Sequence, residues 1–263
     1  MKIGICQFSP KWEDMEYNFS KARTFIIRAV EQQTDFIVFP EMSFTGFTMN
    51  LQLAEKQNGC TIEWMIRTAK EFSVAIGAGF AKKQGIKAEN HYSIVNKNGE
   101  IILDYTKIHP FSFSGEDKYY EGGTQLYTCV LQDVCIGTAI CYDLRFPEIF
   151  QILSQEAHLI LVPANWPGAR KEQWRALCVA RAIENQAYVI GVNCVGEINH
   201  LTYTGDSCVI NPMGENMIPF LEEEQVAIFE LNDDAEVYRR KFPVKQDRRP
   251  ELYKVLKAEQ IQE

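Results

Sequence analysis

The 263-residue chain lacks several features that would assign it to a class of protein at once. No apolar run approaches the roughly eighteen residues of a membrane-spanning helix, so no membrane partner is expected. The apolar stretch at Met1–Phe8 is too short for a signal peptide and no small-residue cleavage site follows it, so we expect a strand there and a cytoplasmic protein. The formal net charge of −8 gives no support to a nucleic-acid partner. Repeats at solenoid periods and low-complexity tracts are also missing.

Paired cysteines are missing as well. The chain has eight cysteines, but no two of them form a Cys-x-x-Cys pair, and several lie in apolar, strand-like runs. Without paired ligand spacing, a structural zinc site is not expected. In a chain of this length with no secretion signal, reduced thiols are a better interpretation than disulfides.

What the sequence contains is an alternation of strand-like and helix-like runs. Apolar residues at helical spacing predict helices over 18–31, 62–72 and 173–185. Unbroken apolar runs at Phe36–Phe39 and Leu159–Pro163 predict strands that are covered on both faces. Such an alternation favours an α/β sandwich with helices outside the sheets, and the length suits one large domain.

Turn signals place further elements. Asn98-Gly99, between two strand-like runs, predicts a hairpin. The segment 107–123 is expected to be irregular, and a polar loop is expected from the strand at Tyr188–Val195 through Asp206. A short helix is expected near 233–241, within a polar C-terminal stretch.

The stretch Ile136–Glu148 predicts a strand-to-helix corner. An apolar run ends at Cys141, and Pro147-Glu148 suits the first turn of a helix. Cys141 is thus expected at the carboxyl end of a strand, where ligands collect in open α/β sheets, and its thiol is expected to have a lowered pKa near a helix start. The alternative for a lone cysteine after a strand is a small buried hydrophobe.

Two other strand ends carry charged residues. Glu41 follows the run Phe36–Pro40, and Lys107 follows the second strand of the predicted hairpin. Each residue alone has an ordinary interpretation, as a capping carboxylate or a surface lysine. Together with Cys141 they form a chemically sensible set for amide hydrolysis: a thiol nucleophile, a carboxylate that moves its proton, and an ammonium facing the oxyanion.

These three segments also resemble a known family. Pro40-Glu41, Lys107-Ile108-His109 and Cys141–Pro147 are similar, in order and across nearly the whole chain, to the signature segments of the nitrilase superfamily of carbon–nitrogen hydrolases. Phe39–Met42 with Thr45–Phe47, and Ala164–Pro167, most resemble the omega-amidase branch, which includes the 2-oxoglutaramate amidases. Further similar segments are Ala180–Gln186, Gly205–Ser207, Asn211–Gly214 and Phe242–Tyr253.

The resemblance implies roles for single residues. Cys141 is the nucleophile, Glu41 the general base and then acid, and Lys107 the oxyanion donor with the backbone N–H of Tyr142. Glu116, seven residues before Gly123, matches a second acidic residue of the family; Glu121 is the alternative. A structural role is favoured for His109 and for Arg145. Residues expected to line a substrate pocket are Tyr142, Asn165, Trp166, Arg170 and Tyr119, with Arg170 a candidate partner for a substrate carboxylate and simple packing the alternative for Tyr119.

The fold and activity implied by the resemblance are equally specific. The fold is a four-layer α-β-β-α sandwich, residues 1–263 forming one domain with a C-terminal extension from about 233 at the interface of a homodimer. The reaction is hydrolysis of the terminal amide of a small 2-oxo acid, such as 2-oxoglutaramate or 2-oxosuccinamate, through a thioester and without a metal or organic cofactor. Alternatives are an N-carbamoyl or other small-amide hydrolase, a nitrilase, and an inactive binding protein.

Overall fold

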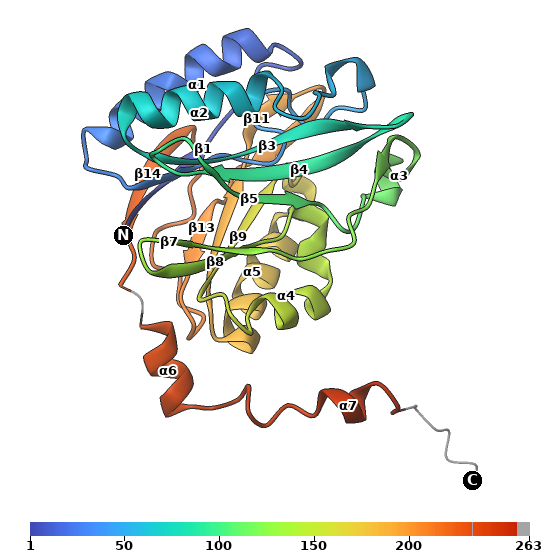
Figure 1. The fold of residues 1–263 in the computed structure, drawn as a ribbon. Helices are drawn as coiled ribbons and strands as arrows, with labels where there is room; N and C mark the ends of the chain where they lie inside the picture. Colours follow the sequence, from blue (N-terminus) through green and yellow to red (C-terminus); the bar gives the residue numbers. More distant parts are fainter. Residues whose placement is uncertain (233, 257–263) are drawn as a thin grey trace.

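Two β-sheets packed face to face form the centre of the molecule, and a pair of helices covers the outer face of each (Figure 1). This arrangement comes from a computed structural model that describes residues 1–232 and 234–256. It is the four-layer α-β-β-α sandwich that the sequence predicted.

The first sheet has the strand order β14-β1-β2-β3-β4-β5, with β6 paired to β4. β1, β2 and β3 run parallel because a helix crosses between each pair. β14, β4 and β5 are antiparallel to their neighbours in this order, and β6 is parallel to β4. The strands are β1 (Lys2–Gln7), β2 (Phe36–Val38), β3 (Ala75–Gln84), β4 (Lys87–Val95), β5 (Ile101–Thr106), β6 (Tyr120–Glu121) and β14 (Gln225–Glu230). The crossing helices are α1 (Met15–Val30) and α2 (Cys60–Phe72).

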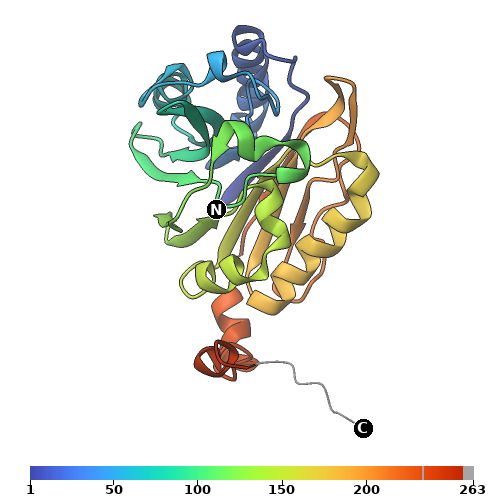
Figure 2. The ribbon, with the colours of Figure 1, turned by 90° about the vertical axis from the view of Figure 1, so that its right-hand side faces the viewer.

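The second sheet has the order β13-β10-β9-β8-β7, in which the three central strands are parallel and the two edge strands antiparallel. Its strands are β7 (Thr128–Leu131), β8 (Val134–Thr138), β9 (Leu159–Ala164), β10 (Tyr188–Asn193) and β13 (Cys208–Ile210). The helices α4 (Pro147–Leu153) and α5 (Lys171–Asn185) cover its outer face. Figure 2 shows both helices on the far side of this sheet from α1.

Strand alternation distributes the apolar side chains over the layers. Ile3 and Ile5 of β1 pack in the cluster between the sheets, and Cys6 packs in the cluster beneath α1 and α2. Central strands such as β9 are buried on both faces, which explains why their sequences are continuously apolar. The packed centre leaves the carboxyl ends of the parallel strands to hold polar residues.

The segment predicted as a polar loop before Asp206 is a hairpin instead, formed by β11 (Val195–Ile198) and β12 (Leu201–Thr204). Its turn residues Asn199 and His200 both have positive φ, at 47° and 63°. Glycine normally marks such a turn, so the sequence carried no hairpin signal here. The hairpin predicted at Asn98-Gly99 is confirmed, with Gly99 at a φ of 79°.

Short elements complete the chain. The segment predicted as irregular between β5 and β7 contains a 3₁₀ turn, one turn of helix, and β6. The short helices are η1 (Leu51–Leu53), η2 (Ser112–Ser114), α3 (Glu116–Tyr119), η3 (Cys141–Arg145) and η4 (Gly168–Arg170). None of the helices within 1–232 and 234–256 is long and apolar enough to cross a membrane.

The C-terminal segment leaves the sandwich. It contains α6 (Ala235–Lys241), as predicted, and α7 (Pro250–Tyr253), and it leads away from the sheets in both views (Figure 1, Figure 2). Arg239 anchors its start by donating hydrogen bonds to the backbone oxygens of Gln186 and Ala157. Residue 233 and the last part of the predicted extension, 257–263, lie outside the described residues.

Candidate active site

Cys141 lies at the corner that the sequence predicted. It follows β8 and opens the 3₁₀ turn η3, and α4 begins six residues later at Pro147. Its backbone is left-handed, with a φ of 47°, a conformation that costs a residue with a side chain free energy. Strain of this kind persists only where the surrounding structure enforces it, so the corner holds the thiol in a fixed orientation.

Glu41 follows β2 at the same edge of the sandwich and is 1% exposed. The backbone can turn there because Gly79 on β3 has no side chain: a Cβ on Gly79 would lie 2.6 Å from the amide nitrogen of Met42. The Glu41 carboxylate accepts hydrogen bonds from Lys107 Nζ at 2.8 Å and from the backbone N–H of Asn165 at 2.9 Å. Each oxygen is therefore held by a donor that follows a strand of a different sheet.

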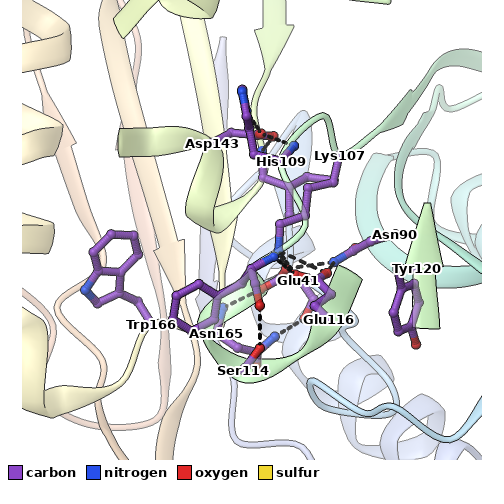
Figure 3. A network of polar contacts seen from close by, with 12 residues as sticks. Glu41, Asn90, Lys107, His109, Ser114, Glu116, Tyr120, Asp143, Asn165 and Trp166 are labelled. Carbon is purple, nitrogen blue, oxygen red and sulfur yellow. Dashed lines mark hydrogen bonds and ion pairs between the residues drawn. The ribbon is translucent and has the colours of Figure 1, made fainter. Parts of the chain in front are cut away.

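Lys107 follows β5 and is also 1% exposed. Its ammonium donates to Glu41 Oε1 at 2.8 Å and to Glu116 Oε2 at 2.9 Å (Figure 3). Burial by itself would lower the pKa of this ammonium, but the Glu116 and Glu41 carboxylates outweigh burial and hold the pKa well above its ordinary value. Lys107 is thus a permanent cation in the site.

Glu116, and not Glu121, is the second carboxylate that contacts Lys107. Glu116 is fully buried at the start of α3, whereas Glu121 is exposed. A residue that the sequence analysis missed joins the two buried carboxylates: Asn90 on β4 donates from its amide nitrogen to Glu41 at 2.8 Å and to Glu116 at 3.0 Å (Figure 3). Asn90 lies within a strand, and a single amide in a strand gives no sequence signal of its own.

The thiol of Cys141 does not have the lowered pKa that the sequence predicted. Burial raises the pKa of this thiol well above its ordinary value, the Glu41 carboxylate raises it further, and Lys107 opposes both. The expectation failed because it considered only a helix start and left out burial, which is the largest cause, and the Glu41 carboxylate. The resting thiol keeps its proton, so attack on a substrate requires a base, and Glu41 is close enough to act on the thiol electrostatically.

A cavity of about 390 Å³ opens over Cys141 and Lys107. Four of the predicted pocket residues line it: Tyr142, Asn165, Trp166 and Arg170. Tyr119 is not among the lining residues; it lies on α3 and is 42% exposed, while its neighbour Tyr120 is buried. Among the described residues, no cluster of three or more His, Cys, Asp or Glu side chains has a geometry for a metal ion.

The cavity also contains residues that the sequence analysis did not place there. Arg145 lines it, with its guanidinium 4.8 Å from the centre of the Trp166 ring and hydrogen-bonded to Gln173. Tyr203 from the unpredicted hairpin and Phe111 line it as well. The sequence analysis favoured a structural role for Arg145, whereas the structure places this residue in the lining of the cavity.

Comparison with known proteins shows which family the chain belongs to. The family model for carbon–nitrogen hydrolases matches residues 2–240. The chain is 34% identical to the 2-oxoglutaramate amidase of Bacillus subtilis over 95% of this chain and 98% of the relative. It is 36% identical to omega-amidase YafV of Escherichia coli over 94% and 96% of the two chains. The crystal structure of XC1258 from Xanthomonas campestris, described as a CN-hydrolase superfamily protein with an arsenic adduct in its active site, has a TM-score of 0.87, 30% identity and coverage of 95% and 97%.

The chain therefore belongs to the carbon–nitrogen hydrolase family. Its fold and its family are those that the sequence predicted, and it is a hydrolase acting on carbon–nitrogen bonds.

Proposed function

We propose that this chain is a cysteine-dependent omega-amidase that hydrolyses the terminal amide of a small 2-oxo acid, such as 2-oxoglutaramate or 2-oxosuccinamate. The observation that carries the proposal is the meeting of Glu41, Lys107 and Cys141 beside one cavity, although the three residues come from different strands. The similarity to an omega-amidase and to a 2-oxoglutaramate amidase supports the choice of substrate class.

The first half of the proposed reaction forms a thioester. Cys141 Sγ attacks the amide carbon while Glu41 takes the thiol proton, which overcomes the raised pKa of the thiol. The negative charge on the substrate oxygen is stabilised by the Lys107 ammonium and the backbone N–H of Tyr142. Glu41 then returns the proton to the amide nitrogen, the carbon–nitrogen bond breaks, and ammonia leaves.

The second half consumes water. Glu41 takes a proton from a water molecule that attacks the thioester carbon, the carbon–sulfur bond breaks, and Cys141 regains its proton from Glu41. Lys107 stabilises the oxyanion again without changing its own charge, because Glu116 and Glu41 keep its pKa high. In this scheme Glu116 holds the ammonium in place.

Two arginines in the cavity lining favour a negatively charged substrate. Arg145 and Arg170 line a cavity whose other walls are largely aromatic and aliphatic, and Arg170 lies over the Phe111 ring. A carboxylate several bonds away from the scissile amide fits such an arrangement because guanidinium groups form charge-assisted hydrogen bonds with it.

A substrate panel tests the proposal. Ammonia release is expected to be fastest from 2-oxoglutaramate or 2-oxosuccinamate and slower from N-carbamoyl amino acids and nitriles. Replacing Arg145 or Arg170 by methionine is expected to raise KM for the oxo-acid amide by about tenfold or more, because a charge-assisted hydrogen bond is lost, and to leave hydrolysis of an uncharged amide little changed. Arg67→Met, on the exposed face of α2, is the matched control.

The panel also separates the alternatives. Preference for an N-carbamoyl amino acid would replace the omega-amidase proposal by that of a carbamoyl hydrolase. A preference for nitriles would make the chain a nitrilase. Absence of ammonia release from every compound would favour a binding protein.

We further propose that residues 1–263 form one domain acting as a cytoplasmic homodimer, with the segment from about 233 at the interface. Exposed apolar side chains on this segment support a partner surface: Phe242, Tyr253, Val255 and Leu256 are all more than half exposed. The free state of all eight cysteines supports a reducing compartment. Sedimentation at micromolar concentration is expected to give twice the chain mass; a monomer would contradict the dimer.

A further inference from the structure

Asp143, two residues after Cys141, has a fully buried carboxylate that accepts four hydrogen bonds. Its Oδ2 accepts from the backbone N–H of Ile140 at 2.9 Å and from the Tyr105 hydroxyl at 2.8 Å. Its Oδ1 accepts from the backbone N–H of His109 at 3.0 Å and from His109 Nδ1 at 2.8 Å. The reaction scheme above uses none of these groups.

The four donors come from two different sheets. Ile140 lies two residues after β8 of the second sheet, while Tyr105, in β5 of the first sheet, and His109, just after β5, lie on either side of Lys107. A local role for Asp143 as a cap of its own 3₁₀ turn accounts for the contact with Ile140. It does not account for the three donors that cross from the other sheet.

The network fixes the backbone on both sides of Lys107. The Tyr105 hydroxyl also accepts a hydrogen bond from the backbone N–H of Ile108 at 3.3 Å. The His109 ring stacks on Phe146, at the end of the cysteine turn, with 3.7 Å between ring centres. Figure 3 shows the His109–Asp143 contact at the backbone end of Lys107 and the carboxylates of Glu41 and Glu116 at its ammonium end.

Burial of a carboxylate costs free energy, and the rest of the contact between the two sheets is largely apolar. Apolar side chains alone hold two layers together but leave their relative position tolerant of small shifts, because dispersion and the hydrophobic effect are not directional. Four hydrogen bonds to one carboxylate are directional, and they join the turn of the nucleophile to the loop of the ammonium.

We propose that Asp143 is a positioning residue that sets the Lys107 ammonium against the Cys141 sulfur, acting through Tyr105 and His109. The proposal rests on the catalytic roles assigned to Lys107 and Cys141. It predicts that Asp143 contributes to turnover and to the electrostatics of the thiol, although it contacts no substrate.

The variant Asp143→Asn tests this directly. An amide in place of the carboxylate must turn an N–H toward the backbone N–H of either Ile140 or His109, neither of which can accept it, so the loop of Lys107 shifts. We expect kcat to fall by about a hundredfold, as for a small misplacement of a catalytic group, with KM nearly unchanged. Steady-state ammonia release gives both constants.

Alkylation of Cys141 by iodoacetamide provides a readout that needs no substrate. Lys107 lowers the pKa of the Cys141 thiol, whereas Glu41 and Glu116 raise it, so an ammonium that moves away leaves a higher pKa. The pH profile of alkylation, followed on the Cys141 peptide by mass spectrometry, is therefore expected to shift to higher pH in Asp143→Asn. The shift should be in the direction of Lys107→Ala, which removes the ammonium outright.

Two controls separate positioning from folding. Asp104→Asn removes the carboxylate of a comparable pair, in which Asp104 on β5 accepts from His91 Nδ1 at 2.8 Å, and it is expected to leave both readouts unchanged. His109→Asn keeps a donor near the position of Nδ1 and should retain most of the rate that His109→Ala loses. Should Asp143→Asn fail to fold, Tyr105→Phe removes one donor and serves in its place.

An unshifted alkylation profile together with wild-type kcat in Asp143→Asn would overturn the proposal. A lower melting temperature with an unshifted profile would reduce Asp143 to a structural role and overturn it equally. Loss of the omega-amidase assignment would not affect this test, because iodoacetamide reports on the thiol whatever the natural amide is.

Discussion

Replacing Cys141 by alanine is expected to reduce ammonia release to the uncatalysed background. The variant keeps the cavity and the contacts among Glu41, Lys107 and Glu116 but has no atom that can form the thioester. The measurement is the single-turnover and steady-state release of ammonia from the best amide of the panel. In the wild-type enzyme, rapid quenching and mass spectrometry should also find the acyl group on the peptide that contains Cys141.

Cys60→Ala is the matched control for this experiment. Cys60 is the exposed cysteine at the start of α2, outside the cavity, and its loss should leave turnover unchanged. A Cys141→Ala enzyme that hydrolyses the amide at a rate near that of the wild type would end the thioester mechanism. The loss of activity in both variants would point instead to damage from the removal of any thiol.

The substitution Glu41→Gln is expected to lower kcat by about a thousandfold or more, at the upper end of the range for loss of a general base. Glutamine has the size of glutamate but cannot accept the thiol proton, and its amide nitrogen has to face either Lys107 or the backbone N–H of Asn165. Steady-state kinetics across the pH range measure the loss. Glu121→Gln, a nearby exposed glutamate, is the control.

The same variant should make the Cys141 thiol more reactive toward alkylation, although amide turnover falls. Glu41 raises the pKa of Cys141, so removal of its charge lowers that pKa and leaves more thiolate at neutral pH. Alkylation by iodoacetamide is then expected to become faster at neutral pH while amide turnover becomes slower. If turnover and alkylation fell together, Glu41 would be a structural support for the cavity and not its base.

The alternation of strand-like and helix-like runs predicted an α/β sandwich, and the family resemblance implied its four layers. The main catalytic candidates could be predicted because they follow from the positions of strand ends. Glu41, Lys107 and Cys141 each come shortly after a strand, and the carboxyl ends of those strands meet at one edge. Glu116, which the resemblance favoured over Glu121 as the second acidic residue, is the buried carboxylate within the segment 107–123.

The remaining details depend on geometry that local sequence does not encode. Arg145 reaches the cavity through a 3₁₀ turn, and Tyr203 through a hairpin whose turn has no glycine. Tyr119 and Tyr120 are equivalent in the sequence, yet only Tyr120 is buried, which is decided by the pairing of β6 with β4. The thiol pKa depends on desolvation and on Glu41, which approaches only in the folded chain.

The left-handed backbone at Cys141 means that the residue best for catalysis is not the residue best for folding stability. A residue with a Cβ is less stable in this conformation than glycine by about 1–2 kcal/mol, so selection for stability alone would favour glycine at this position. Glycine, however, has no sulfur. The fold thus retains a local conformational penalty at the residue on which its proposed chemistry depends. Among random substitutions selected for thermal tolerance, replacements of Cys141 by glycine should therefore appear, and these should abolish turnover.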